Sequence, residues 1–257
     1  MIVPLLFVFC LIVGISALMY RGSVQEFQVL QKEYKHNQPW SEILGEQLPL
    51  VVRTLPNSWM GAWTHAQTAS KSWELHVKEH GQTFRTTWAT WVADPQGVPD
   101  LEPLAEVSKL NESVQQWMSE GFRRWSWLPS HVQTAMPRLL RTGEIVPVQQ
   151  HRAAFTAFVA TDGPPLILWI AHEGAVPANT ANELRGKDPW IQTVKEIPWI
   201  GEVKYIEVKL RPGNAILIPS HWWVAVKPVE SKESVLSWYW TAEFHTPISW
   251  VVSRYKK

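Results

Sequence analysis

Histidines at metal-ligand spacing are the first side chains of this sequence that could do chemistry. His76-Val77-Lys78-Glu79-His80 fits the His-x-x-Glu-His pattern of inverted zinc peptidases. On a helix, these two imidazoles would lie on one face because they are four residues apart. Gly81 ends the expected helix, and no third helical carboxylate follows. We therefore interpret the pair as last-turn histidines that the helix dipole stabilises without a metal.

Other catalytic signatures are missing from the sequence. It has no Gly-x-Ser-x-Gly elbow, no phosphate-binding glycine loop and no paired-cysteine zinc site, which removes support for hydrolase, kinase and zinc-finger functions. The single cysteine, Cys10, lies in an apolar N-terminal run, which favours a reducing compartment. The net charge of +1 gives no reason to expect a nucleic-acid partner. The 17 tryptophans are expected mainly to fill a core.

The elements that position these side chains read as a mainly β domain with flanking helices. In the first half we expect strands at residues 49–53 and 86–92, and helices at residues 63–81, 101–125 and 130–141. Beyond Gly143 we expect strands at residues 151–161, 165–171, 206–210, 215–219 and 234–244. The turn Asp162-Gly163-Pro164 predicts that the first two of these form a hairpin.

The most specific stretch of the chain runs from Leu210 to Val226, LRPGNAILIPSHWWVAV. It resembles the JmjC and cupin-8 oxygenases, in which a Pro-Gly-Asp turn precedes an apolar strand ending in Pro and a Trp-Trp-His-x-Val segment. Residues 49–53 and 237–240 are similar to two further strands of that family. The resemblance covers roughly residues 39–250 and implies a double-stranded β-helix of the cupin or jelly-roll kind.

The resemblance also implies an iron site that this sequence does not complete. The family binds Fe(II) and 2-oxoglutarate with two histidines and one carboxylate. Val224 stands at the last histidine position, and either Gln150 or His151 stands at the first. The two registers put Arg152 or Ala153 in place of the carboxylate, and no lysine for 2-oxoglutarate follows the turn at Gly163.

An uncharged run from Ile2 to Tyr20 precedes the domain. At about 1.5 Å per helical residue it reaches roughly the 30 Å of a bilayer core, so we predict a membrane span. A cleaved signal peptide, cut after Ser16 or Ala17, is the alternative, but the positive n-region is absent. The basic residues Arg21, Lys32 and Lys35 follow the span and place the domain on the cytoplasmic side.

The sequence therefore predicts three segments: a transmembrane anchor at residues 1–21, a connector at residues 22–38 and a JmjC/cupin-8-like domain at residues 39–257. We expect a tryptophan-rich pseudoenzyme that binds or scaffolds a protein partner, with no catalytic residue, metal or cofactor. The alternative is an Fe(II)/2-oxoglutarate-dependent hydroxylase with rearranged ligands, for which His151, His221 and Glu243 are the candidates.

Overall fold

The computed structural model describes residues 10–11, 28–35, 47–57, 63–121, 131–177, 181–230 and 235–245. The strands are β1 (Leu30–Glu33), β2 (Leu50–Arg53), β3 (Glu74–Glu79), β4 (Gln82–Thr87), β5 (Val98–Pro99), β6 (His131–Arg141), β7 (Val146–Gln150), β8 (Phe155–Asp162), β9 (Leu166–His172), β10 (Ile206–Leu210), β11 (Ala215–Pro219), β12 (Trp222–Pro228) and β13 (Leu236–His245). The helices are α3 (His65–Thr68), α4 (Trp88–Ala93), α5 (Glu102–Val107), α6 (Leu110–Gly121) and α7 (Ala181–Leu184), with 3-10 turns η2 (Glu173–Ala175) and η3 (Ile200–Glu202).

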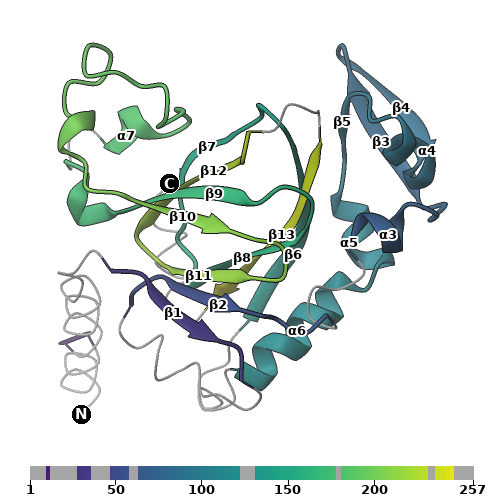
Figure 1. Cartoon of the computed structure of the whole chain (residues 1–257), viewed down its shortest axis with the longest axis horizontal. Helices are drawn as coiled ribbons and strands as arrows, with labels where there is room; N and C mark the ends of the chain where they lie inside the picture. Colours follow the sequence, from purple (N-terminus) through teal and green to yellow (C-terminus); the bar gives the residue numbers. More distant parts are fainter. Residues whose placement is uncertain are drawn as a thin grey trace.

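Two of the three sheets pack face to face as a β-sandwich (Figure 1). The six-stranded sheet has the order β1-β2-β11-β8-β13-β6, and the four-stranded sheet has the order β10-β9-β12-β7. Side chains from both sheets meet in one buried apolar cluster, which includes Phe158 and Ile216 from the first sheet and Ile170 and Val224 from the second. A mainly β architecture with flanking helices, as predicted, is therefore confirmed.

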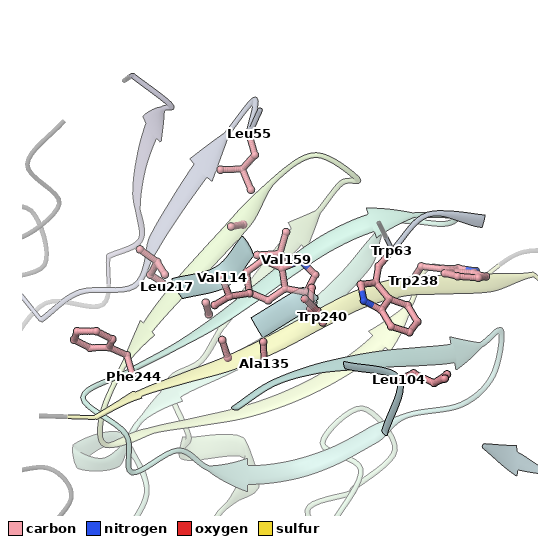
Figure 2. Packing of buried hydrophobic residues seen from close by; sticks show 14 of the residues in the cluster. Leu55, Trp63, Leu104, Val114, Ala135, Val159, Leu217, Trp238, Trp240 and Phe244 are labelled. Atoms are coloured by element: carbon pink, nitrogen blue, oxygen red, sulfur yellow. The ribbon is translucent and has the colours of Figure 1, made fainter. Parts of the chain in front are cut away.

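The outer face of the six-stranded sheet carries a second core, rich in tryptophan. Trp88 makes edge-on contacts with Trp63 and Trp238, at ring-centroid distances of 5.5 and 5.6 Å. Figure 2 shows Trp63, Trp238 and Trp240 converging with aliphatic side chains from several elements. The prediction that tryptophans fill the core is confirmed for these residues.

Strand predictions in the C-terminal half and at residues 50–53 are confirmed. β2 pairs with β11, so two of the three stretches that carry the family resemblance lie side by side. The Asn214 side chain joins them at the turn, because its Oδ1 accepts a hydrogen bond from the Thr54 backbone N–H at 3.1 Å.

The predicted hairpin at the Asp162-Gly163-Pro164 turn is wrong. β8 pairs with β11 and β13 in the six-stranded sheet, whereas β9 pairs with β10 and β12 in the other. Both strands are buried along almost their whole length, so each needs neighbours on both edges. The turn therefore carries the chain from one sheet to the other.

The predicted helix at residues 63–81 is also wrong for most of its length. Only α3 is helical there, and β3 follows. Leu75 and Val77 are buried while His76 and Lys78 are exposed, which is the alternation of a strand. His80 and Gly81, both at positive φ, form the two-residue turn into β4. The helical histidine pair that zinc peptidases need is therefore absent.

Three further expectations are corrected in the elements that follow. The strand expected at residues 86–92 ends at Thr87, whose hydroxyl caps α4 by accepting a hydrogen bond from the Thr90 N–H at 3.3 Å. The long helix expected at residues 101–125 is divided into α5 and α6 by Lys109, which has a φ of 56°. The helix expected at residues 130–141 is the edge strand β6, where Pro137 is tolerated because an edge strand does not need every N–H.

The N-terminal predictions fall mostly outside the described residues. Of the predicted span Ile2–Tyr20, only Cys10 and Leu11 are described, and both are helical. In the described ranges, no helix is long and apolar enough to cross a membrane. Residues 30–33, which the sequence assigns to the connector, form β1 and pair in parallel with β2.

Candidate functional site

The position of the expected iron site lies where β7 and β12 pair. Val224 is opposite Gln149, and Trp223 is opposite Gln150. Val224 is 1% exposed and packs among apolar side chains between the two sheets. Gln149 therefore faces the valine, although the sequence places Gln150 or His151 at the first histidine position. Neither glutamine nor valine is a usual ligand for iron.

His151 follows β7 and lies at one end of the sandwich interior. Its ring packs edge-on against Phe158, with centroids 5.5 Å apart. Its backbone N–H donates to the Trp222 carbonyl, and its carbonyl accepts from the His221 N–H, both at 3.2 Å. These bonds place β7 beside the start of β12, and we call this end of the sandwich the mouth.

Glu243 on β13 brings two imidazoles together at the mouth. Its Oε1 is 3.8 Å from His151 Nδ1, and its Oε2 is 3.3 Å from His245 Nε2. The His151 and His245 imidazoles lower the pKa of Glu243 to about 2, against the opposing effect of burial. The His245 side chain is 5% exposed, and its buried Nδ1 has no hydrogen-bond partner among the described residues. Within the same part of the chain, the buried hydroxyl of Thr156, the register partner of Glu243 on β8, has none either.

A second histidine pair lies next to the first. His221 Nδ1 is 2.7 Å from the Glu173 Oε2, and His221 has a φ of 68°. His172 ends β9, and its Nδ1 accepts a hydrogen bond from the Gly174 N–H at 3.1 Å. Burial and the neighbouring His221 lower the pKa of His172. Accepting that bond requires an unprotonated Nδ1, so the neutral ring is the form that fits.

The structure thus brings together some of the predicted candidates and separates others. His151 and Glu243 are neighbours, whereas His221 pairs with Glu173 instead. Over the described ranges, no group of three or more His, Cys, Asp or Glu side chains has the arrangement that could hold a metal ion. His172 and Glu173 were not among the predicted candidates, although a histidine and an acid directly after the apolar strand at residues 165–171 gave a signal.

An aromatic groove lies over the outer face of the four-stranded sheet. It has a volume of about 490 Å³, and none of its ten lining residues is charged. Trp169 and Tyr205 stack along it with centroids 5.5 Å apart. The Trp190 ring is held in place by its Nε1–H, which donates to Glu207 at 2.6 Å, and by the Lys227 ammonium, 4.6 Å from the ring centroid. The groove is therefore lined by aromatic, aliphatic and uncharged polar side chains, and two contacts hold its Trp190 ring.

Comparison of the chain with protein-family models and with curated proteins finds no match.

Proposed function

We propose that this chain is a membrane-anchored, catalytically inactive relative of the JmjC-like oxygenases that works by binding a protein partner. The course of the chain supports a double-stranded β-helix. Strands β6 to β13 alternate between the two sheets except at β9 and β10, which are neighbours. This gives the orders β11-β8-β13-β6 and β10-β9-β12-β7, so each half of the eight strands contributes two strands to each sheet.

The observation that carries the loss of oxygenase chemistry is the burial of Val224, at the last histidine position of the family, among apolar side chains. A facial triad needs two imidazoles and a carboxylate directed at one point. A buried valine offers no lone pair, and its methyl groups fill the space that a metal would occupy between the sheets. The residues at the family's iron positions therefore do not fit Fe(II).

Metal binding tests this proposal directly. The purified full chain, incubated anaerobically with Fe(II) and 2-oxoglutarate and then passed through gel filtration, is expected to retain no stoichiometric iron and to consume no 2-oxoglutarate. A Val224→His variant in the same assay reports whether one restored imidazole is enough to retain iron. Stoichiometric iron in the unaltered chain, together with turnover of 2-oxoglutarate, would overturn the proposal.

The types of side chain gathered around Glu243, although not their arrangement, suggest one alternative, a hydroxylase with rearranged ligands. One carboxylate between the imidazoles of His151 and His245 has the composition of a facial triad, although the positions differ from those of the family. If iron does bind, Glu243→Gln separates the two explanations. Loss of iron in that variant would place the metal at the mouth.

The aromatic groove supports the binding role. None of the lining side chains is charged, and the neighbouring Glu207 and Lys227 already contact the Trp190 ring, so an ionised side chain of a partner would lose hydration there for little gain. We therefore propose that the occupant is a short uncharged, apolar segment of a partner protein. Tyr205 is 53% exposed and lines the groove, whereas Val98, 70% exposed, lies on another sheet.

A peptide array tests the groove. Uncharged apolar peptides that bind the chain are expected to lose binding with Tyr205→Ala and to keep it with the control Val98→Ala. Equal binding by the two variants would remove the groove from the proposal.

A further inference from the structure

We propose that the β3–β4 hairpin carries a binding site for a phosphomonoester, a ligand that the sandwich and its mouth do not involve. The hairpin and the end of β5 enclose a pocket of about 340 Å³. Its lining residues are all polar: His76, Lys78, Thr83, Arg85 and Asp100. His76 and Lys78 belong to the His-x-x-Glu-His motif that suggested a zinc site on a helix. Because this segment is a strand, the two side chains instead lie on one face of the hairpin.

The period of the strands gathers the cations on one face. His76 is opposite Arg85, and Lys78 is opposite Thr83. Side chains on directly opposite residues lie roughly 5 Å apart, and diagonal neighbours roughly 7 to 8 Å, so all four can reach one group of phosphate size. Leu75 and Val77 alternate with them and are buried against the tryptophan core, which fixes the orientation of the strand.

A closely approaching loop forms the wall of the pocket. Gly97 has a φ of +66°, and a Cβ there would lie 2.7 Å from the Lys78 carbonyl oxygen, so only glycine lets the chain come this near to β3. The Asp100 N–H then donates to the His76 carbonyl at 2.8 Å. Arg141 holds the same loop from the six-stranded sheet, because its guanidinium donates to the Pro95 carbonyl at 2.7 Å.

The lining of this pocket carries one more cation than carboxylate, with Lys78 and Arg85 against Asp100. Lys78 and Arg85 are diagonal neighbours on paired strands, so their like charges lie on the same face of the hairpin. Arg85 pairs with Glu74 at 3.2 Å, but both side chains are more than 60% exposed, and such a pair contributes little. Asp100 adds one negative charge to the lining, on the side of the pocket where its Oδ1 accepts the Glu102 N–H at 3.2 Å. For Lys78, the described residues supply no acidic partner within 4.0 Å.

A phosphomonoester supplies the anionic partner that Lys78 lacks among the described residues. It brings about 1.5 to 2 negative charges and three strong acceptor oxygens. Lys78 offers a compact charge, Arg85 offers a planar pair of donors that suits phosphate, and Thr83 offers a hydroxyl donor. The pocket is open to solvent and larger than one phosphate, so the group can be carried by a lipid head group or by a free metabolite of the same chemistry.

The test uses two probes that share a phosphomonoester on glycerol: free glycerol 3-phosphate and short-chain dihexanoyl phosphatidic acid. The purified full chain is titrated with each by calorimetry, with dihexanoyl phosphatidylcholine, a phosphodiester, as the negative probe. We expect Lys78→Gln to weaken binding at least about tenfold, which corresponds to one charge-assisted contact. Lys209→Gln removes an exposed lysine on β10 and is expected to leave the affinity unchanged.

The outcomes separate the source of the ligand from the existence of the site. Equal affinity for the two probes identifies a free phosphomonoester, and at least tenfold tighter binding of phosphatidic acid identifies a lipid head group. The proposal would be overturned if neither probe bound the chain, or if Lys78→Gln and Lys209→Gln bound the probes with equal affinity. Neither result depends on iron or on the groove, so the proposed function is tested separately.

Discussion

Gly163 lies at the turn where the chain passes between the two sheets, and of the described glycines it is the one where an added methyl group would lie nearest to other atoms. Its φ is +81°, and a Cβ there would lie 2.1 Å from the Leu236 carbonyl oxygen, where at least 3.0 Å is needed. Gly163→Ala therefore adds two costs. The left-handed conformation costs an L-residue about 1 to 2 kcal/mol, and forcing backbone apart in a packed region costs about 1 to 3 kcal/mol more.

Gly143→Ala is a matched control, because Gly143 has a φ of +88° and no heavy atom within 4 Å of the added Cβ. Urea unfolding of the two variants, followed by tryptophan fluorescence, gives the free energy of unfolding of each. We expect a loss of about 2 to 5 kcal/mol for Gly163→Ala and only about 1 to 2 kcal/mol for Gly143→Ala. Equal losses would refute the contact between this turn and the start of β13.

Two further predictions concern the pH dependence of the mouth. Because the folded-state pKa of Glu243 is about 2, below its ordinary 4.5, the ionised carboxylate stabilises the fold above about pH 4.5, and this contribution is lost as the pH falls toward 2. Glu243→Gln should thus lower the free energy of unfolding at pH 7 by about 1 kcal/mol, after allowing for the half-exposed Glu243 side chain, and by less at pH 3. Urea titration at each pH measures this free energy. A loss of the same size at both pH values would contradict the prediction. For His172, the pKa is lowered, so its stabilising bond to the Gly174 N–H is present above its ordinary pKa of 6.5 and weakens as the pH falls below it. In the unaltered chain, amide hydrogen exchange at residues 174–176 should become faster as the pH falls from 7.5 to 5.5, beyond the change expected from its intrinsic pH dependence. The His172→Asn variant should not show this acceleration, because asparagine keeps an N-cap acceptor but does not titrate. The same acceleration in both proteins would exclude His172 as the titrating group.

The candidate site shows how far sequence alone reaches. His151 and Glu243 are 92 positions apart, yet both were candidates, because His151 lies next to the family's histidine position and a shifted metal site there would need an acid such as Glu243. Their proximity, 3.8 Å, depends on β7 and β13 ending at the same mouth. His221 was a candidate because it lies three residues before Val224, but its Nδ1 lies 2.7 Å from the Glu173 Oε2 instead.

What the sequence determined by itself is the local conformation wherever burial has a clear period. Residues 206–210 and 215–219 are strands because alternating or continuous apolar side chains match one or two buried faces. Where short helices and strands share the same residue types, as at residues 74–79 and 131–141, the local pattern predicted a helix but the structure has a strand.

Only the tertiary structure decided which strands pair. Asp162-Gly163-Pro164 is equally good turn chemistry for a hairpin and for a crossing between sheets, because a turn fixes only a few dihedral angles. The pairing of β8 with β11 and β13, which follow it by more than 50 residues in sequence, decides between the two. Because these strands occupy both edges of β8, β9 cannot pair with it. Pairing partners are non-local, so the composition of the mouth follows from the fold and not from any segment of the chain.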